Sequence, residues 1–351
     1  MGNLCSKKSS HHYCAPDESV VSPLNNISHR ILDATVWAMN VFPPPLPARS
    51  QRPISEYVQP VTSKGQRPIS EYVQPVTSQV LTEPWRQMIW RGKDAIIKDL
   101  EGFKPSSAVL KILLHGPTGA GKSCFINSVQ RILLGRNAIV ALEQTTQSGT
   151  SFTKTIRSHK LKKRGGGRFP FVFSDIMGLE AENAGGILTE DINKVLEGHI
   201  SDGYTFHPTK SITEDHQKYN HNPNLCDKVH CLVSILPADS ISRISDKVFH
   251  KMKKIREKAA QMNIPQVTVL TKVDVACNVV NGDLKKVYYS KKIKEKIQEC
   301  SIKTGLPLNC IYPVKNYHAE ITQDANIDTL ILVALSDIVN FANDYVEDLE
   351  E

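Results

Sequence analysis

The stretch from residue 110 to residue 129 reads LKILLHGPTGAGKSCFINSV, and it decides the fold class of the folded part of the chain. Its first six residues are mostly apolar, as in a buried strand. Residues 116–123 follow the pattern GxxxxGKS, and the residues after them, from Cys124 to Val129, continue with helical spacing. A strand, a glycine loop and a helix in this order are what a phosphate-binding P-loop requires.

The residue types in this loop suit the binding of a phosphorylated ligand. Glycine lets the backbone wrap the phosphates closely, and successive backbone N–H groups and the helix N-terminus then face the anion. We expect Lys122 to reach the β- and γ-phosphates and the Ser123 hydroxyl to bind Mg²⁺. The alternative, an accidental glycine-rich turn, fits poorly with the flanking strand and helix. The expected phosphate-binding set is Gly116, Thr118, Gly119, Ala120, Gly121, Lys122, Ser123 and Cys124.

A second element, residues 171–178, reads FVFSDIMG, an apolar strand that ends in Asp-x-x-Gly. An acidic residue at the carboxyl end of such a strand faces the ligand crevice of an open α/β sheet. We therefore expect Asp175 to hold magnesium through water and Gly178 to offer its N–H to the γ-phosphate. The motif alone is weak, because Asp and Gly are common turn residues, but its place after a strand strengthens it.

A third element, residues 267–274, reads VTVLTKVD, again a strand that ends in a polar tetrad. In GTPases the corresponding loop uses its carboxylate to accept two hydrogen bonds from guanine, a match that adenine cannot offer. We expect Asp274 to select the base, Lys272 to cover it, and Thr271 to belong to the same loop. A site built to bond a polar edge rejects the analogue that lacks it. The alternative is a charged helix start after a strand.

Apolar runs alternate with amphipathic helical stretches along the chain from about residue 85. Such alternation favours an α/β fold with a mainly parallel sheet covered on both faces. We expect a tail at 1–80, a lead-in helix within 81–106 and the P-loop domain at 107–351. The expected strands are 109–114, 169–173, 229–236, 267–270 and 310–314, and the expected helices are 124–134, 187–199, 245–262, 284–300 and 327–349.

One further strand is expected at 150–158, antiparallel to 169–173 across a basic, glycine-rich turn at 162–168. A solvated hairpin tip is the simpler interpretation of this turn, because most charge runs face water. Contact with a phosphate or a lipid is the alternative.

At this point the sequence resembles a Ras-like G domain and, more closely, the interferon-induced protein 44 family. The resemblance runs from Glu83 to the C-terminus and includes stretches outside the nucleotide motifs, at 196–200, 229–231, 271–274, 312–317 and 343–349. It implies a Ras-like P-loop NTPase fold preceded by a disordered tail, and a cytoplasmic GTP-binding protein that responds to interferon or infection. By their place after the last strand, Lys315 and Asn316 resemble the loop that closes over the base.

Two departures from these patterns bear on function. Leu179 stands where Ras-like enzymes place the glutamine that orients the attacking water, so hydrolysis by that route is in doubt. The TLDc-type domain of longer family members is not visible. The magnesium-binding threonine of the first switch is taken as Thr153, with Thr150, Ser151 and Thr155 as alternatives. Four histidines in a polar insert at 198–226 suggest a surface loop rather than a metal site.

The tail carries candidate address and docking signals. Gly2, with Ser6 four residues later, fits N-myristoylation, and Cys5 is a candidate for palmitoylation beside two lysines. Residues Pro44–Arg49 fit a polyproline ligand of an SH3 domain. A 13-residue segment at 51–63 recurs at 66–78 and offers two tyrosines for SH2 binding after phosphorylation.

Composition sets broad limits on function. The net charge of +7 is too mild and too scattered to indicate nucleic-acid binding. The eight cysteines show no zinc spacing, and reduced thiols in the cytosol are the simplest interpretation. The sequence contains no uninterrupted run of about 18 apolar residues, so it does not indicate a membrane span.

The function we expect from these observations is a GTP-binding switch or weak GTPase with Mg²⁺, cytoplasmic and tethered to membrane through the tail. The alternative is an acylated signalling scaffold whose G domain is degenerate and whose tail binds SH3 and SH2 partners. A nucleotide-dependent homodimer is a further candidate, and an ATPase is disfavoured by the tetrad at Thr271.

Overall fold

A computed structural model describes residues 79–90, 92–106, 109–141, 154–181 and 186–351. The lipidation signal, the proline motif, the repeat, and three switch candidates (Thr150, Ser151 and Thr153) therefore lie outside the described residues.

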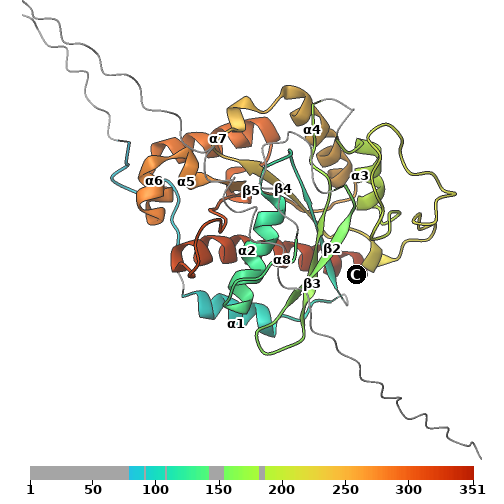
Figure 1. The fold of residues 1–351 in the computed structure, drawn as a ribbon, viewed down its shortest axis with the longest axis horizontal. Helices are drawn as coiled ribbons and strands as arrows, with labels where there is room; N and C mark the ends of the chain where they lie inside the picture. Colours follow the sequence, from blue (N-terminus) through green and yellow to red (C-terminus); the bar gives the residue numbers. More distant parts are fainter. Residues whose placement is uncertain (1–78, 91, 107–108, 142–153, 182–185) are drawn as a thin grey trace, which may run out of the picture. The chain divides into compact units, whose positions relative to one another are not determined.

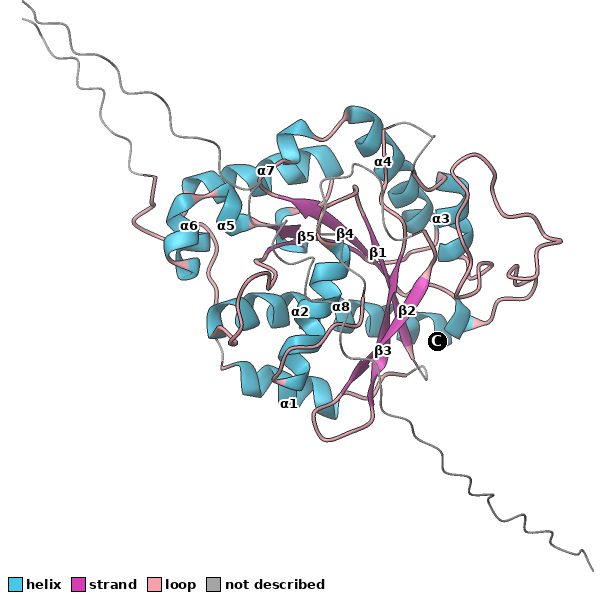
Figure 2. Cartoon of the chain, viewed as in Figure 1, coloured by secondary structure: helices cyan, strands magenta, loops and turns pink. Residues whose placement is uncertain are grey.

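A six-stranded sheet in the order β2-β3-β1-β4-β5-β6 forms the centre of the fold (Figures 1 and 2). Every neighbouring pair is parallel except the antiparallel pair of β2 and β3. The prediction of a mainly parallel α/β sheet is confirmed. The strands are β1 (Leu110–His115), β2 (Arg157–Lys162), β3 (Arg168–Asp175), β4 (Cys231–Pro237), β5 (Gln266–Thr271) and β6 (Ile311–Pro313).

Helices cover the sheet on both faces, which explains why the central strands are apolar along their whole length. On one face α1 and α2 contact α8, and on the other α3 contacts α4, which contacts α7 (Figure 1). The α-helices are α1 (Lys93–Gly102), α2 (Lys122–Leu134), α3 (Thr189–Leu196), α4 (Asp246–Gln261), α5 (Val273–Ala276), α6 (Asn278–Gly282), α7 (Lys291–Thr304) and α8 (Ala325–Glu350).

The C-terminal helix α8 is capped by Asp324, whose side chain accepts hydrogen bonds from the N–H groups of Asn326 and Ile327. Among the described residues it alone is long and apolar enough to cross a membrane, with a mean hydropathy of 1.4 in its most apolar window. However, 61% of that window is buried, and α8 contacts β1, β4 and β6. The helix therefore serves as part of the hydrophobic core.

The strand expected at 150–158 is wrong in position, because β2 begins only at Arg157. The segment before it pairs with the insert instead: Ile156 N–H donates to Tyr204 O at 2.9 Å, and Phe206 N–H donates to Lys154 O at 2.9 Å. The basic turn between β2 and β3 is where it was expected. An edge strand can exchange partners along its length in this way, and composition does not reveal the change.

The helix expected at 284–300 is wrong at its start, because a short 3₁₀ helix and a break replace its first third. A 3₁₀ helix at Leu284–Tyr288 is followed by α7, which starts at Lys291. Ser290 separates them, since its buried hydroxyl accepts a hydrogen bond from Ile293 N–H at 3.2 Å. Serine is a preferred N-cap, so the true helix start carries a sequence signal that the apolar periodicity conceals.

Candidate functional site

The glycine loop between β1 and α2 is closed by backbone that only glycine allows. Gly116 has a φ of 144°, and a Cβ on it would lie 2.2 Å from the Ile235 carbonyl oxygen. Gly121 has a φ of 95°, and a Cβ there would lie 3.1 Å from Asn316 Nδ2. A Cβ at either position would therefore be strained by the backbone and crowded by its neighbours.

Lys122, the first residue of α2, folds back over this loop. Its Nζ donates to the carbonyl oxygens of Gly116 and Pro117, at 3.3 Å each. Burial lowers the pKa of Lys122, while the nearby Asp175 carboxylate acts in the opposite direction. A buried ammonium whose hydrogen bonds go to neutral carbonyls gains from the approach of an anion.

Ser123 and Asp175 meet at the carboxyl edge of the sheet, because β1 and β3 are parallel neighbours that end there. The Ser123 hydroxyl donates to Asp175 Oδ2 at 2.7 Å. The other carboxylate oxygen, Oδ1, is buried and has no hydrogen-bond partner among the described residues. A hydroxyl and a carboxylate with an unsatisfied oxygen are the hard oxygen ligands that Mg²⁺ prefers, so this pair fits a magnesium ion.

The segment after Asp175 packs directly on the glycine loop. Leu179 N–H donates to Gly116 O at 3.0 Å, and Thr118 N–H donates to Leu179 O at 3.4 Å. A Cβ on Gly178 would lie 2.4 Å from Thr118 Oγ1, so glycine is needed here for close approach. The Leu179 side chain is only 1% exposed. An apolar side chain buried in this way cannot orient a water molecule.

The segments at the ends of β5 and β6 also reach the glycine loop. The Thr271 hydroxyl, at the end of β5, donates to Ala120 O at 2.7 Å. Asn316, after β6, donates from Nδ2 to Gly121 O at 3.2 Å, and its Oδ1 is buried without a partner in the described part of the chain. The structure thus brings Thr271 and Asn316 to the loop.

Asp274 lies in the first turn of α5, two residues after Lys272, whose left-handed φ of 59° turns the chain out of β5. Its carboxylate Oδ2 lies 3.8 Å from Lys315 Nζ, which also pairs with Glu320 at 2.7 Å. Burial acts to raise the pKa of Glu320, but the His318 N–H and Lys315 outweigh it and lower the pKa to about 2. The sequence predicted Lys315 at this loop, but it did not reveal Glu320 or the pairing of Lys315 with both carboxylates.

Comparisons with known proteins identify relatives of this chain. No family model matches it. Interferon-induced protein 44 from Homo sapiens is 34% identical over 261 residues, which is 73% of this chain and 58% of the relative. The Mus musculus protein of the same name is 34% identical over 258 residues, 72% of this chain and 60% of the relative. Interferon-induced protein 44-like from Homo sapiens is 30% identical over 261 residues, 73% of this chain and 57% of the relative.

The chain belongs to the interferon-induced protein 44 family. The resemblance to this family found in the sequence is therefore confirmed. The matched region spans less than two thirds of each relative's length.

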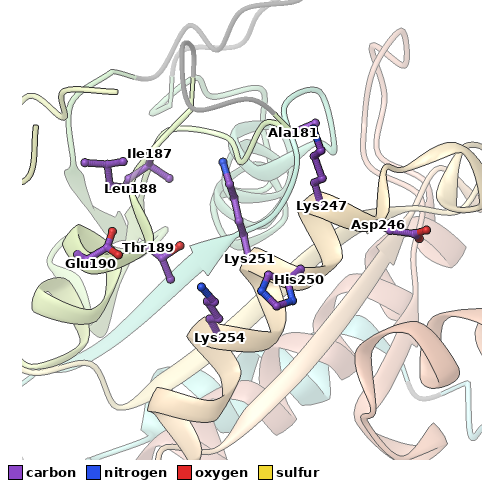
Figure 3. Close-up of a pocket in the computed structure, with 10 residues that line it drawn as sticks. All are labelled: Ala181, Ile187, Leu188, Thr189, Glu190, Asp246, Lys247, His250, Lys251 and Lys254. Carbon is purple, nitrogen blue, oxygen red and sulfur yellow. The ribbon is translucent and has the colours of Figure 1, made fainter. Parts of the chain in front are cut away.

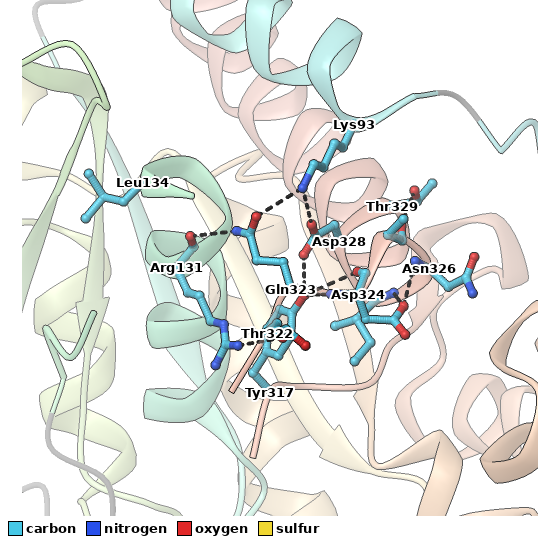
Figure 4. Close-up of polar contacts among 12 residues, drawn as sticks. Lys93, Arg131, Leu134, Tyr317, Thr322, Gln323, Asp324, Asn326, Asp328 and Thr329 are labelled. Atoms are coloured by element: carbon cyan, nitrogen blue, oxygen red, sulfur yellow. Dashed lines mark hydrogen bonds and ion pairs between the residues drawn. The ribbon is translucent and has the colours of Figure 1, made fainter. Parts of the chain in front are cut away.

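In this member of the interferon-induced protein 44 family, the loop that carries Lys315 and Asn316 is anchored on α2. Tyr317 N–H donates to the Ser128 hydroxyl at 3.0 Å. The Arg131 guanidinium donates to Glu320 O and Thr322 O, both at 2.7 Å, and it lies 4.0 Å from the centre of the Tyr317 ring (Figure 4). Bonds to two carbonyls fix the path of the loop more firmly than one contact would.

The same loop is tied to α8 and to the lead-in helix α1. The Tyr317 hydroxyl donates to Asp328 Oδ1 at 2.6 Å, and Lys93 Nζ pairs with Asp328 Oδ2 at 3.1 Å (Figure 4). Lys93 also donates to Gln323 Oε1 at 3.0 Å. Asp328 is fully buried, so Lys93 and Tyr317 satisfy a carboxylate that has no access to water. Gln323 and Asp328 lie more than 200 residues after Lys93 in the sequence, and no local signal identifies them as its partners.

A separate hollow of about 500 Å³ lies between α3 and α4, beside the segment that follows Leu179 (Figure 3). One of its lining residues, Lys251, donates to Glu180 O at 2.9 Å, and Glu180 accepts a bond from the Thr118 hydroxyl at 3.2 Å. Glu180 thereby connects the glycine loop to α4.

The remaining predicted positions give a mixed result. Gly119 and Cys124 lie in the glycine loop and the first turn of α2, as expected. Thr155 bonds to the Thr205 hydroxyl of the insert at 3.0 Å. Within the described residues no three His, Cys, Asp or Glu side chains form a group that could hold a metal, and His199 stacks on Tyr219 with ring centres 5.3 Å apart.

Proposed function

We propose that the described part of this chain is a P-loop G domain that binds GTP with Mg²⁺. The single observation that carries the proposal is the bond between the Ser123 hydroxyl and Asp175, which leaves one buried carboxylate oxygen without a partner. An unsatisfied buried oxygen is costly unless a ligand completes it. Mg²⁺ keeps several waters and binds through few protein oxygens, so two side chains and the phosphates suffice.

The phosphates would lie over the loop from Gly116 to Ser123. Backbone N–H groups of the loop and the N-terminus of α2 provide the electropositive surface. Lys122 would exchange its two carbonyl contacts for phosphate oxygens, which are stronger acceptors for an ammonium group.

The base would lie against the loops that end β5 and β6. Asp274 would accept from the guanine edge, and Lys272 would cover the ring. Lys315 approaches the same carboxylate from the β6 loop, and Asn316 links that loop to Gly121. Because Lys315 is shared with Glu320, its charge is largely satisfied before it reaches Asp274, which leaves the Asp274 carboxylate available to the base.

We infer slow or absent hydrolysis. The buried Leu179 supports this inference, since a Ras-like enzyme needs a polar side chain there to hold the attacking water. Magnesium supplies charge neutralisation for the phosphates when it is bound, and the residues of this chain bind and orient them.

Cellular placement belongs to the same proposal. The family name of the relatives supports a role in the response to interferon, and the tail signals at Gly2 and Cys5 support attachment to a membrane from the cytoplasm. The SH3 motif at Pro44–Arg49 would then present a partner site beside that membrane.

The test is nucleotide binding by the full chain, measured by calorimetry with GTP and ATP in the presence of Mg²⁺. We expect GTP to bind more tightly than ATP, and Asp274→Ala to lose roughly 100-fold in GTP affinity while ATP binding stays unchanged. The matched control is Asp344→Ala, which removes a carboxylate of the same length from an exposed position of α8. Equal affinity of the wild-type chain for both nucleotides, or no binding of either, would contradict the proposal.

A further inference from the structure

A basic surface lies at the turn between β2 and β3, beside the end of α2. Five basic side chains line a hollow of about 530 Å³ there, and no acidic side chain lines it. We call this the hairpin surface; its basic residues are Arg136, Lys162, Lys163, Arg164 and Arg168.

The charges of the hairpin surface are not cancelled by neighbouring acids. None of the five forms an ion pair in the described part of the chain. Three of them donate hydrogen bonds to carbonyl oxygens: Lys163 to Glu101 O at 3.0 Å, Arg164 to Leu134 O at 3.3 Å and Arg168 to Lys160 O at 3.3 Å. Carbonyl groups orient these side chains but leave their positive charge in place.

The backbone of the turn allows a close approach to a flat partner. Gly166 and Gly167 have φ values of 96° and 75°, and a Cβ on either would have nothing within 4 Å. The tip is therefore free of side chains that would hold a surface away from the flanking cations. Lys162, Arg164 and Arg168 are all exposed around it.

The hairpin surface and the glycine loop lie at opposite ends of the parallel strands. β3 runs parallel to β1 and begins at Arg168, whereas the glycine loop follows the last residue of β1. A partner bound at the turn would therefore contact the end of the sheet away from the glycine loop.

We propose that the hairpin surface docks on an anionic phospholipid bilayer. A bilayer fits because the charges surround an open turn instead of a closed cavity, and a lipid headgroup layer presents many phosphates in one plane. No aromatic side chain lines the hollow, and Phe169, under Lys163, is only 3% exposed, so bases have no ring on which to stack. The inference is independent of nucleotide binding.

The surface also provides what an acyl chain alone lacks. One myristoyl chain binds a membrane only marginally, and stable attachment needs a second signal such as a basic patch. Each basic residue near an anionic leaflet strengthens binding by about fivefold. Attraction of this kind falls with added salt, because ions screen exposed charges.

The test uses the full chain produced without acylation and sedimented with vesicles. One set contains phosphatidylcholine alone, and the other contains phosphatidylcholine with roughly 30% phosphatidylserine. The test variant combines Lys163→Gln, Arg164→Gln and Arg168→Gln. The control combines Lys285→Gln, Lys286→Gln and Lys292→Gln, which removes the same charge from exposed positions before and within α7.

We expect wild type and control to bind the phosphatidylserine vesicles in low salt, and the test variant to bind roughly 100-fold more weakly. Thermal unfolding of both variants would establish that they are folded. Equal losses in the two variants would mean that only net charge matters, and would overturn the proposal. So would equal binding to both vesicle types, or binding of a DNA duplex, lost in the test variant, without any binding to vesicles.

Discussion

The two ends of the candidate site differ in how they are built. At the phosphate end, the groups come from one continuous loop and from Asp175 on the neighbouring strand. At the base end, Asp274 and Lys315 come from separate segments, and side chains of α1, α2 and α8 hold the one that carries Lys315. The phosphate end is thus specified locally, whereas the base end depends on the whole domain being assembled.

The largest effect is expected at the phosphate end. Lys122→Met should lower the affinity for GTP and ATP alike by roughly 100-fold, because both share the phosphates that Lys122 would bind. The unfolding midpoint without nucleotide should stay the same or rise, since burial already lowers the pKa of this lysine. Calorimetry and thermal unfolding measure the two quantities. If the variant lost affinity for only one of the two nucleotides, Lys122 would contact the base, and its assignment to the phosphate end would be wrong.

The next effect concerns the anchors of the base end. Lys93→Met should destabilise the domain by about 2 kcal/mol, because the buried Asp328 would keep only Tyr317 as a partner. Urea unfolding measures it, with Lys98→Met as the matched control from the exposed side of α1. Hydrogen exchange should also increase in residues 317–324. If exchange rose equally throughout the sheet, α1 would not be a specific anchor of this loop.

The smallest effect tests whether water is excluded from His115, the last residue of β1, beside the phosphate end. Burial lowers the pKa of His115 to about 3, with Lys122 and Arg256 adding to the effect. The unfolded chain therefore binds a proton below pH 6.5 that the folded chain refuses, so stability falls as the pH drops.

Between pH 6.5 and about pH 5, His115 should account for a loss of roughly 1.5 kcal/mol. His115→Leu should remove this part of the pH dependence, although it adds a constant cost at Ser234, whose hydroxyl contacts His115 Nε2 at 2.7 Å. Ser234→Ala is the control, because it removes the contact and keeps the titrating group. Parallel stability curves for wild type and His115→Leu would show that His115 is accessible to protons.

Much of the fold is predictable from the sequence where the signal is local. The glycine loop is a run of consecutive residues, and the apolar strands are buried along their length, so both stand out in the sequence. The start of α7 at Ser290 and the change of partner before Arg157 are different, because competing tertiary contacts decide them. The Lys93–Asp328 pair joins residues at opposite ends of the described domain, and nothing near either residue marks the other.

Leu179 has a consequence for how the proposed function would operate over time. A G protein that hydrolyses its nucleotide measures an interval, since its active state ends at a set rate. With an apolar side chain buried at this position, the bound state would end mainly by dissociation. The fraction of molecules in that state would then follow the ratio of the GTP concentration to Kd, so the protein would respond to the nucleotide supply of the cell instead of keeping time.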